Sequence, residues 1–166
     1  MQDYLANARW QHSKKRAELV NGDQTIIEID FTHKNALVKF SDQQLKIIKE
    51  GFWSPKIASS KGGAVISRQK PIGVWGTKNE FVLDNEVYLA QSRQGTLYQI
   101  TYYKNDIALL TYKLDTLKGR SVVTFEIKSR QIPQNHLLIF LALGFYSIKA
   151  AALESLSDDF MISAVA

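Results

Sequence analysis

The 166-residue chain is predicted to be all-β with a central helix. The expected architecture is an antiparallel β-barrel, or a strongly curved sheet, of about 11–12 short strands that enclose one hydrophobic C-terminal helix. Short strand-like runs follow one another between residues 24 and 130, with turn-forming residues between them. Residues 137–148 then show no polar face, which is typical of a helix buried on every side. No helix separates the strand-like runs, which disfavours a parallel sheet.

The order of elements indicates one domain over residues 1–166. Its expected parts are an N-terminal segment (residues 1–22, with a short helix carried by Leu5, Ala8, Ala17 and Leu19), the strands (24–130), the helix (133–154) and a loosely held tail (155–166). Within the tail, Phe160, Met161 and Ile162 could dock on the domain.

Two hairpins stand out among the strand-like runs. The clearest joins Thr96–Tyr103 to Ile107–Leu114 through Lys104-Asn105-Asp106, because Asn and Asp tolerate positive φ. A second tight turn is expected at Asp84-Asn85-Glu86.

The predicted helix has a plausible start, since Pro133 has no N–H group to leave unpaired in a first turn. The uninterrupted apolar run spans only residues 137–148, whereas a membrane span needs roughly 17–25 residues. We therefore expect a buried core helix rather than a membrane anchor.

The bulk composition limits the chemistry and the location. There is no cysteine, which excludes disulfides, thiolate zinc sites and cysteine nucleophiles. The first twenty residues lack the apolar core of a signal peptide. The expected location is cytoplasmic, with a peripheral association with membrane as an option, and no cofactor is expected.

The positive charge is concentrated in one block. Residues 34–79 carry nine basic side chains and only Asp42 and Glu50 as acids, a net charge of +7, whereas the whole chain has +5. Such asymmetry is typical of a protein with an anionic partner. The alternative is a solvated face of hairpins, with lysines protecting strand edges.

Cations and aromatic residues alternate within this block, as at membrane interfaces or on single-stranded nucleic acid. The predicted anionic-ligand residues are Lys46, Lys49, Lys56, Lys61, Arg68, Lys70, Lys78, Trp53 and Trp75. The two tryptophans could instead be core or barrel-end residues. Arg68 and Lys70 share strand parity with Ile66 and Ile72, so they predict either a bulge or an exterior face there.

Signatures of catalysis or metal binding are weak. His12, His33 and His136 lie far apart, and His136 is expected to cap or pack the helix start. Ser67-Arg68-Gln69-Lys70 matches a Ser-x-x-Lys pattern but lacks the companion motifs of that enzyme class. The acidic pair Asp84 and Glu86 is expected to be a solvated hairpin tip. No catalytic or metal-binding residue is therefore predicted.

A series of antiparallel strands that closes on a hydrophobic helix resembles the tubby C-terminal-like superfamily, which includes the tubby domain, phospholipid scramblases and LURP-one-related proteins. The resemblance rests on Asn135–Tyr146 as the central helix and on Tyr98–Leu110 as a late hairpin, and it covers roughly residues 24–150. It implies a barrel of roughly twelve strands around that helix. In this superfamily the tubby domain binds phosphoinositides and scramblases act at membranes, but no ligand-contacting residue is transferred to this chain.

The sequence thus predicts a non-enzymatic binding domain for anionic membrane lipid headgroups, peripheral rather than transmembrane. The alternative is a protein–protein interaction or regulatory scaffold that binds an acidic protein partner. Nucleic acid is a less favoured ligand, and an enzyme of unrecognised type stays open.

Overall fold

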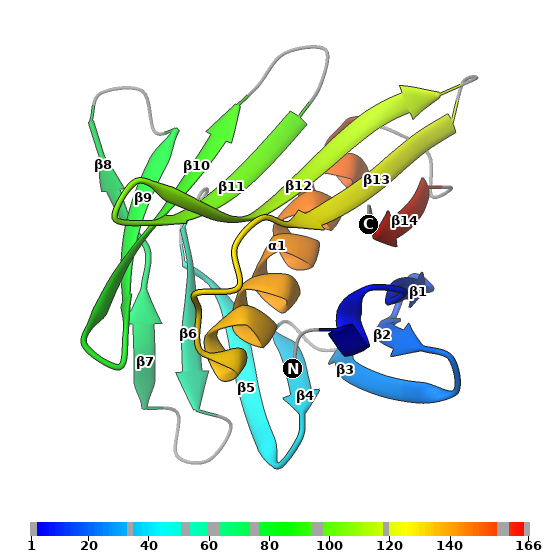
Figure 1. Cartoon of the computed structure of the whole chain (residues 1–166), viewed down its shortest axis with the longest axis horizontal. Helices are drawn as coiled ribbons and strands as arrows, with labels where there is room; N and C mark the ends of the chain where they lie inside the picture. Colours follow the sequence, from blue (N-terminus) through cyan, green and yellow to red (C-terminus); the bar gives the residue numbers. More distant parts are fainter. Residues whose placement is uncertain are drawn as a thin grey trace.

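The computed structural model describes residues 3–32, 35–50, 54–59, 64–73, 77–93, 98–117, 120–155 and 160–164. The structure is mostly β with one helix near the C-terminus, as predicted (Figure 1). The helix α1 (Gln134–Ser155) lies among the strands, which curve around it.

Fourteen strands and a short 3-10 helix precede or follow α1 within the described residues. The first elements are η1 (Asp3–Leu5), β1 (Arg9–His12), β2 (Arg16–Asn21), β3 (Gln24–Asp30), β4 (Ala36–Phe40), β5 (Gln43–Glu50), β6 (Ser54–Ser59) and β7 (Val65–Arg68). The others are β8 (Lys70–Ile72), β9 (Lys78–Leu83), β10 (Glu86–Arg93), β11 (Tyr98–Lys104), β12 (Ile107–Leu117), β13 (Arg120–Ile127) and β14 (Phe160–Ala164).

The strands are hydrogen-bonded in the order β7-β6-β5-β4-β3-β2-β1-β14-β13-β12-β11-β10-β9-β8. The two ends of this order, β7 and β8, are neighbours in the chain and are separated only by Gln69. One strand thus bends at Gln69, pairing with β6 before the bend and with β9 after it. We call this bend, residues 65–72, the β7–β8 corner.

Two details of the predicted barrel need correction. The described residues form fourteen strands rather than 11–12. Closure of the barrel stays a prediction, because no ladder joins β7 to β8 within those residues. The sheet is also not wholly antiparallel, because β14 pairs with β13 in parallel. The helix α1 is the crossover that a parallel pair requires. The sequence shows a helix but not which strands it connects.

The helix predicted for the N-terminal segment is wrong. Residues 9–21 form β1 and β2 instead, since the buried side chains Ala17 and Leu19 alternate with the half-buried Glu18. In the tail, Phe160, Met161 and Ile162 do dock: they belong to β14, which lies between β1 and β13.

Both predicted hairpins are confirmed. Asp84 and Asn85 (φ 48° and 64°) connect β9 to β10, and Asn105 and Asp106 have the same two φ values between β11 and β12. Positive φ at both central residues defines the type I′ turn, whose twist matches that of the flanking strands.

The helix α1 is buried on all sides over residues 136–145. Its buried apolar side chains, each at most 8% exposed, are Leu137, Leu138, Ile139, Phe140, Leu141, Ala142, Leu143, Phe145 and Ile148. This burial confirms the prediction drawn from the missing polar face. The apolar area removed from water makes α1 the centre of the core.

Candidate anionic-ligand surface

The outer face of the β5–β7 strands brings three of the predicted cations together. On β5, Leu45 and Ile47 are buried, so Lys46 and Ile48 point outward. On β6 and β7, the buried Ile57 lies opposite the buried Ser67, and Lys56 lies opposite Arg68 on the outer face. Each of the three strands therefore contributes one basic side chain.

The strand register sets the spacing of these cations. Lys56 and Arg68 are direct cross-strand partners. Lys46 lies opposite Ala58, and is thus a diagonal neighbour of Lys56. Direct partners have Cβ atoms about 5 Å apart and diagonal ones about 7–8 Å. Two like charges directly opposite each other disfavour folding. We call Lys46, Lys56 and Arg68 the basic patch.

The remaining predicted residues do not join the patch. Lys49 has the parity of the buried Ile47 and reaches solvent at the end of β5. Lys70 lies on β8, after the bend at Gln69, and Lys78 lies on β9. Lys61, Trp53 and Trp75 lie outside the described residues.

Of the two alternatives predicted for Arg68 and Lys70, a bulge or an exterior face, the corner shows both. Ile66 and Ile72 are 41% and 40% exposed, and Arg68 and Lys70 are exposed beside them. The register shifts between Ile57 and Ala58, which leaves Ile66 without a cross-strand partner. The hydroxyl of Ser67 points inward and has no hydrogen-bond partner. Because Ser67 and Lys70 lie on opposite faces, they do not form a nucleophile–base pair.

Sequence reasoning missed one cation, Lys39 of β4, which lies on the same outer face as the basic patch. It belongs to the +7 block, so the alternation of Val38, Lys39 and Phe40 could have identified it.

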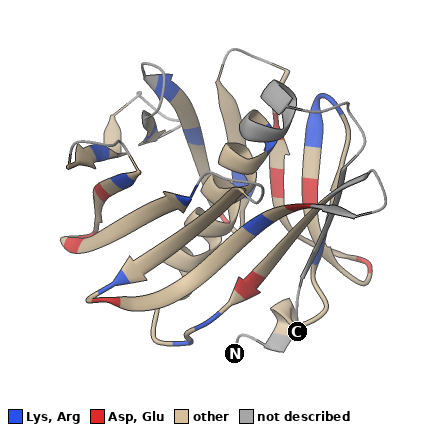
Figure 2. Cartoon of the chain, turned by 90° about the horizontal axis from the view of Figure 1, so that it is seen from above, with Lys and Arg blue, Asp and Glu red and all other residues tan. Residues whose placement is uncertain are grey.

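The charge changes sign on the strands beyond Lys39. Glu18 and Glu28 share the outer face of β2 and β3, where Arg16 forms ion pairs with them at 3.5 and 2.8 Å. Lys39 is the cross-strand partner of Glu28 and marks the boundary. Figure 2 marks Lys and Arg in blue and Asp and Glu in red along the strands. Some strands, such as β2 and β9, carry both signs. The outer face of β5–β7 is basic, whereas the neighbouring face of β2 and β3 carries ion-paired acids.

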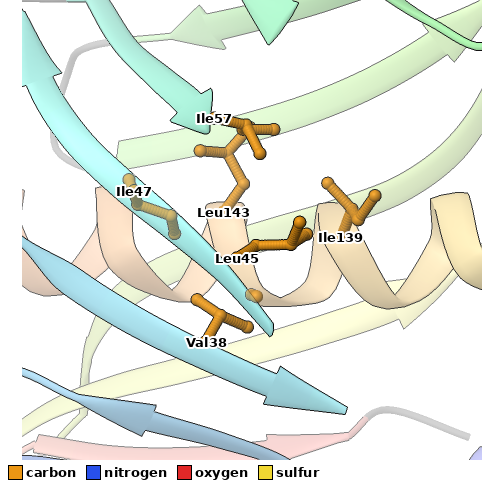
Figure 3. A pocket seen from close by; sticks show the side chains of 7 residues that line it. Val38, Leu45, Ile47, Ile57, Ile139 and Leu143 are labelled. Carbon is orange, nitrogen blue, oxygen red and sulfur yellow. The ribbon is translucent and has the colours of Figure 1, made fainter. Parts of the chain in front are cut away.

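An apolar hollow lies beneath the outer face, between α1 and the strands β4–β6 (Figure 3). It is small, with room for about one water molecule, and it is partly open to solvent. Its lining is Val38, Leu45, Ile47, Ile57, Ile139, Ala142 and Leu143. None of these side chains can bind an anion by hydrogen bonding or charge, so the hollow is no part of the basic patch.

A second constellation of polar groups lies at the start of α1. The hydroxyl of Tyr88 is 2.6 Å from Nδ1 of His136, and Nε2 of His136 is 2.8 Å from Oδ2 of Asp84. When the Nε2–H group of His136 donates to the Asp84 carboxylate, Nδ1 accepts a hydrogen bond from the Tyr88 hydroxyl. The packing role expected for His136 agrees with this geometry. Asp84 does lie at a solvated hairpin tip, with a side chain 74% exposed.

This Asp84–His136–Tyr88 chain does not activate the tyrosine. Burial raises the pKa of Tyr88 to about 12, with smaller contributions from the charges of Glu86 and Asp84. A general base or nucleophile requires the opposite shift. Tyr88 is also only 1% exposed, so a substrate could not reach its hydroxyl. The arrangement fastens the β9–β10 hairpin to the helix.

The described part of the chain holds neither a metal-binding cluster nor a membrane-spanning helix. No group of three or more His, Asp or Glu side chains there is placed to hold a metal ion. Nor does any helix within the described ranges have the length and apolar content required to cross a membrane.

Comparison of the chain with models of protein families, with curated proteins and with solved structures finds no match. The comparisons thus assign no family. The resemblance to the tubby C-terminal-like superfamily stays a prediction.

Proposed function

We propose that the protein is a binding domain that attaches peripherally to membranes carrying anionic lipid headgroups, on the cytoplasmic side, through its basic patch. The observation that carries the proposal is the alignment of Lys46, Lys56 and Arg68 on the outer face of three adjacent strands. A tubby-like barrel, closed at the β7–β8 corner, belongs to the same proposal.

The magnitude of the attraction favours a membrane over a single soluble anion. Each Lys or Arg near an anionic bilayer contributes about 1 kcal/mol. Four cations, with Lys39 included, would give about 4 kcal/mol, which corresponds to a dissociation constant of about 1 mM. A bilayer offers many headgroups at high local density, so weak contacts of this kind can act together. An isolated phosphate would be bound too weakly to matter.

The test is co-sedimentation of the purified chain with vesicles of increasing anionic lipid content, at low and at high salt. We expect binding that rises with anionic lipid and falls with salt, since surface charges are screened. The triple variant Lys46→Gln/Lys56→Gln/Arg68→Gln should lose at least ~10-fold in affinity at low salt, because three contributions of about 1 kcal/mol are removed.

A matched triple variant controls for net charge. Lys15, Arg93 and Lys113 are exposed cations on strands or turns away from the patch. Their replacement by Gln removes the same charge and should cost less affinity than the patch variant, with the difference widening as salt is raised, because distant surface charges are screened at higher salt. Equal losses of vesicle affinity in the two triple variants would show that binding depends on net charge and not on the basic patch. Absence of binding to any anionic vesicle at low salt would refute the proposal and leave the acidic protein partner as the ligand to seek.

A further inference from the structure

The β7–β8 corner presents two aliphatic and two basic side chains on the outside of the sheet. Along residues 66–72, the outward positions are Ile66, Arg68, Lys70 and Ile72. The intervening Ser67 is buried and faces the interior. The two cations therefore lie between two exposed isoleucines on one bent strand.

The corner collects much of the exposed aliphatic surface of the described residues. Val65, Ile66 and Ile72 are 45%, 41% and 40% exposed, and Val82 on the neighbouring β9 is 42% exposed. Single exposed aliphatic residues are ordinary, but a group of them beside cations is typical of an interaction surface. Val87 of β10 is the cross-strand partner of Val82 and extends this group, whereas the exposed Ile107 adjoins the turn between β11 and β12.

The charges that face the corner come from the strands on either side of it. Lys56 of β6 lies opposite Arg68, and Glu80 of β9 lies opposite Lys70. Lys78 lies opposite Ile72. Among the described residues paired in register with the corner, Lys56 and Lys78 add to Arg68 and Lys70, and Glu80 is the acid, so this set carries a net positive charge.

We propose that the β7–β8 corner is the membrane-penetrating edge of this surface: Ile66 and Ile72 enter the boundary between headgroups and acyl chains while Arg68 and Lys70 bind headgroup phosphates. This inference rests on the proposed function and specifies its ligand as a lipid bilayer rather than a soluble polyanion.

The chemistry of the corner fits a bilayer better than a soluble ligand. A polyanion would gain from Arg68 and Lys70 but would leave the isoleucines in water. A bilayer provides anionic groups at its surface and an apolar layer directly below, and surface-bound proteins bury their apolar side chains about 5–10 Å deep there. The electrostatic attraction of the patch is weak alone, and stable attachment generally needs such a second contribution.

The experiment uses the absence of cysteine from the chain. A single cysteine is introduced by Ile66→Cys or Ile72→Cys and labelled with a fluorophore that brightens in an apolar environment. The matched controls are Thr25→Cys and Ile107→Cys, where the native side chains are exposed but lie away from the corner, on β3 and β12. All four labelled proteins are mixed with vesicles of phosphatidylcholine and phosphatidylserine, with and without bromine on the acyl chains.

We expect the labels at residues 66 and 72 to brighten on binding and to be quenched by the brominated acyl chains. The control labels should remain in an aqueous environment, and inositol hexakisphosphate should change none of the four. Vesicles that sediment the protein while the corner labels stay aqueous would overturn this inference and leave the proposed function intact. A protein that does not sediment at all would instead refute the proposed function.

A second variant separates penetration from charge. Ile66→Ser/Ile72→Ser replaces exposed side chains, so its far-UV circular dichroism should match that of the native chain. We expect it to lose at least ~10-fold in vesicle affinity, and the loss should persist at high salt because apolar transfer is not screened. A loss smaller than ~2-fold at both salt concentrations would contradict penetration.

Discussion

The helix α1 is held differently by the two halves of the sheet. On the β9–β12 side, the ring of Phe140 stacks on Tyr102 at 5.2 Å and meets Tyr88 edge-on at 4.8 Å. On the β4–β6 side, aliphatic residues face α1 across the apolar hollow. Aromatic pairs have preferred geometries, whereas aliphatic contacts are non-directional. The aromatic half therefore determines the position of the helix.

Hydrogen bonds reinforce this difference. The indole N–H of Trp10 donates to the Tyr112 hydroxyl at 3.1 Å, and that hydroxyl donates to the carbonyl of Leu141 at 2.7 Å. Gly144 lets the Tyr112 ring approach the helix, since a Cβ there would lie 2.4 Å from Cε2 of Tyr112. The aliphatic half has a tolerant interior, and its exterior carries the proposed membrane surface.

The largest expected effect tests the close approach at Gly144. Ala normally stabilises a helix by about 1 kcal/mol relative to Gly. At Gly144→Ala the added methyl group overlaps the Tyr112 ring, which is held at its hydroxyl, and overpacking of this kind costs about 3 kcal/mol. We expect a net loss of about 2 kcal/mol or more in urea denaturation, given these two opposing terms. A stabilised variant would show that the ring can move aside.

Tyr112→Phe tests the hydrogen bonds without changing the packing. It leaves the buried indole N–H of Trp10 without a hydrogen-bond acceptor, which costs about 1–3 kcal/mol of folding stability. The same measurement on Tyr103→Phe, at a half-buried outer position, should stay within about 0.5 kcal/mol of the native protein. Equal losses in the two variants would remove the special role of Tyr112.

Alkaline pH should weaken the aromatic half. Burial raises the pKa of Tyr88 from 10.0 to about 12, so above pH 10 the unfolded chain releases a proton that the folded protein retains. Its contribution to stability is complete below pH 10 and is lost as the pH rises toward 12. Urea denaturation at pH values on both sides of 10 measures the decline. Tyr88→Phe should show a shallower decline, and an unchanged slope would assign the effect to other groups.

The smallest effect is expected on the aliphatic side. Ala142 lines the hollow, so Ala142→Val adds two carbons where space exists. We expect a change of less than about 1 kcal/mol in the free energy of unfolding, since filling space offsets the helix preference against a β-branched side chain. A loss as large as that of Gly144→Ala would mean that the two halves hold the helix equally tightly.

Prediction of the candidate site from the sequence was partial. Alternation along β5 and β6 predicts which residues share a face, and the +7 block predicts where the cations gather. The pairing of Lys56 with Arg68 depends on the register of β6 and β7, and a one-residue shift would send every side chain to the other face. The hydrogen bonds of His136 with Tyr88 and Asp84 join residues that are 48 and 52 positions apart in the chain, and no local sequence pattern reveals such pairs.

The sequence by itself determined the properties that depend on local periodicity. These are the mostly β class, the two type I′ hairpins and the buried helix, whose lack of a polar face requires surrounding strands. Only the tertiary structure decided that β14 lies between β1 and β13, that β7 and β8 form one bent strand, and that three cations share a surface. Such features arise from pairing between distant segments, and their stability comes from contacts that exist only once the sheet is assembled.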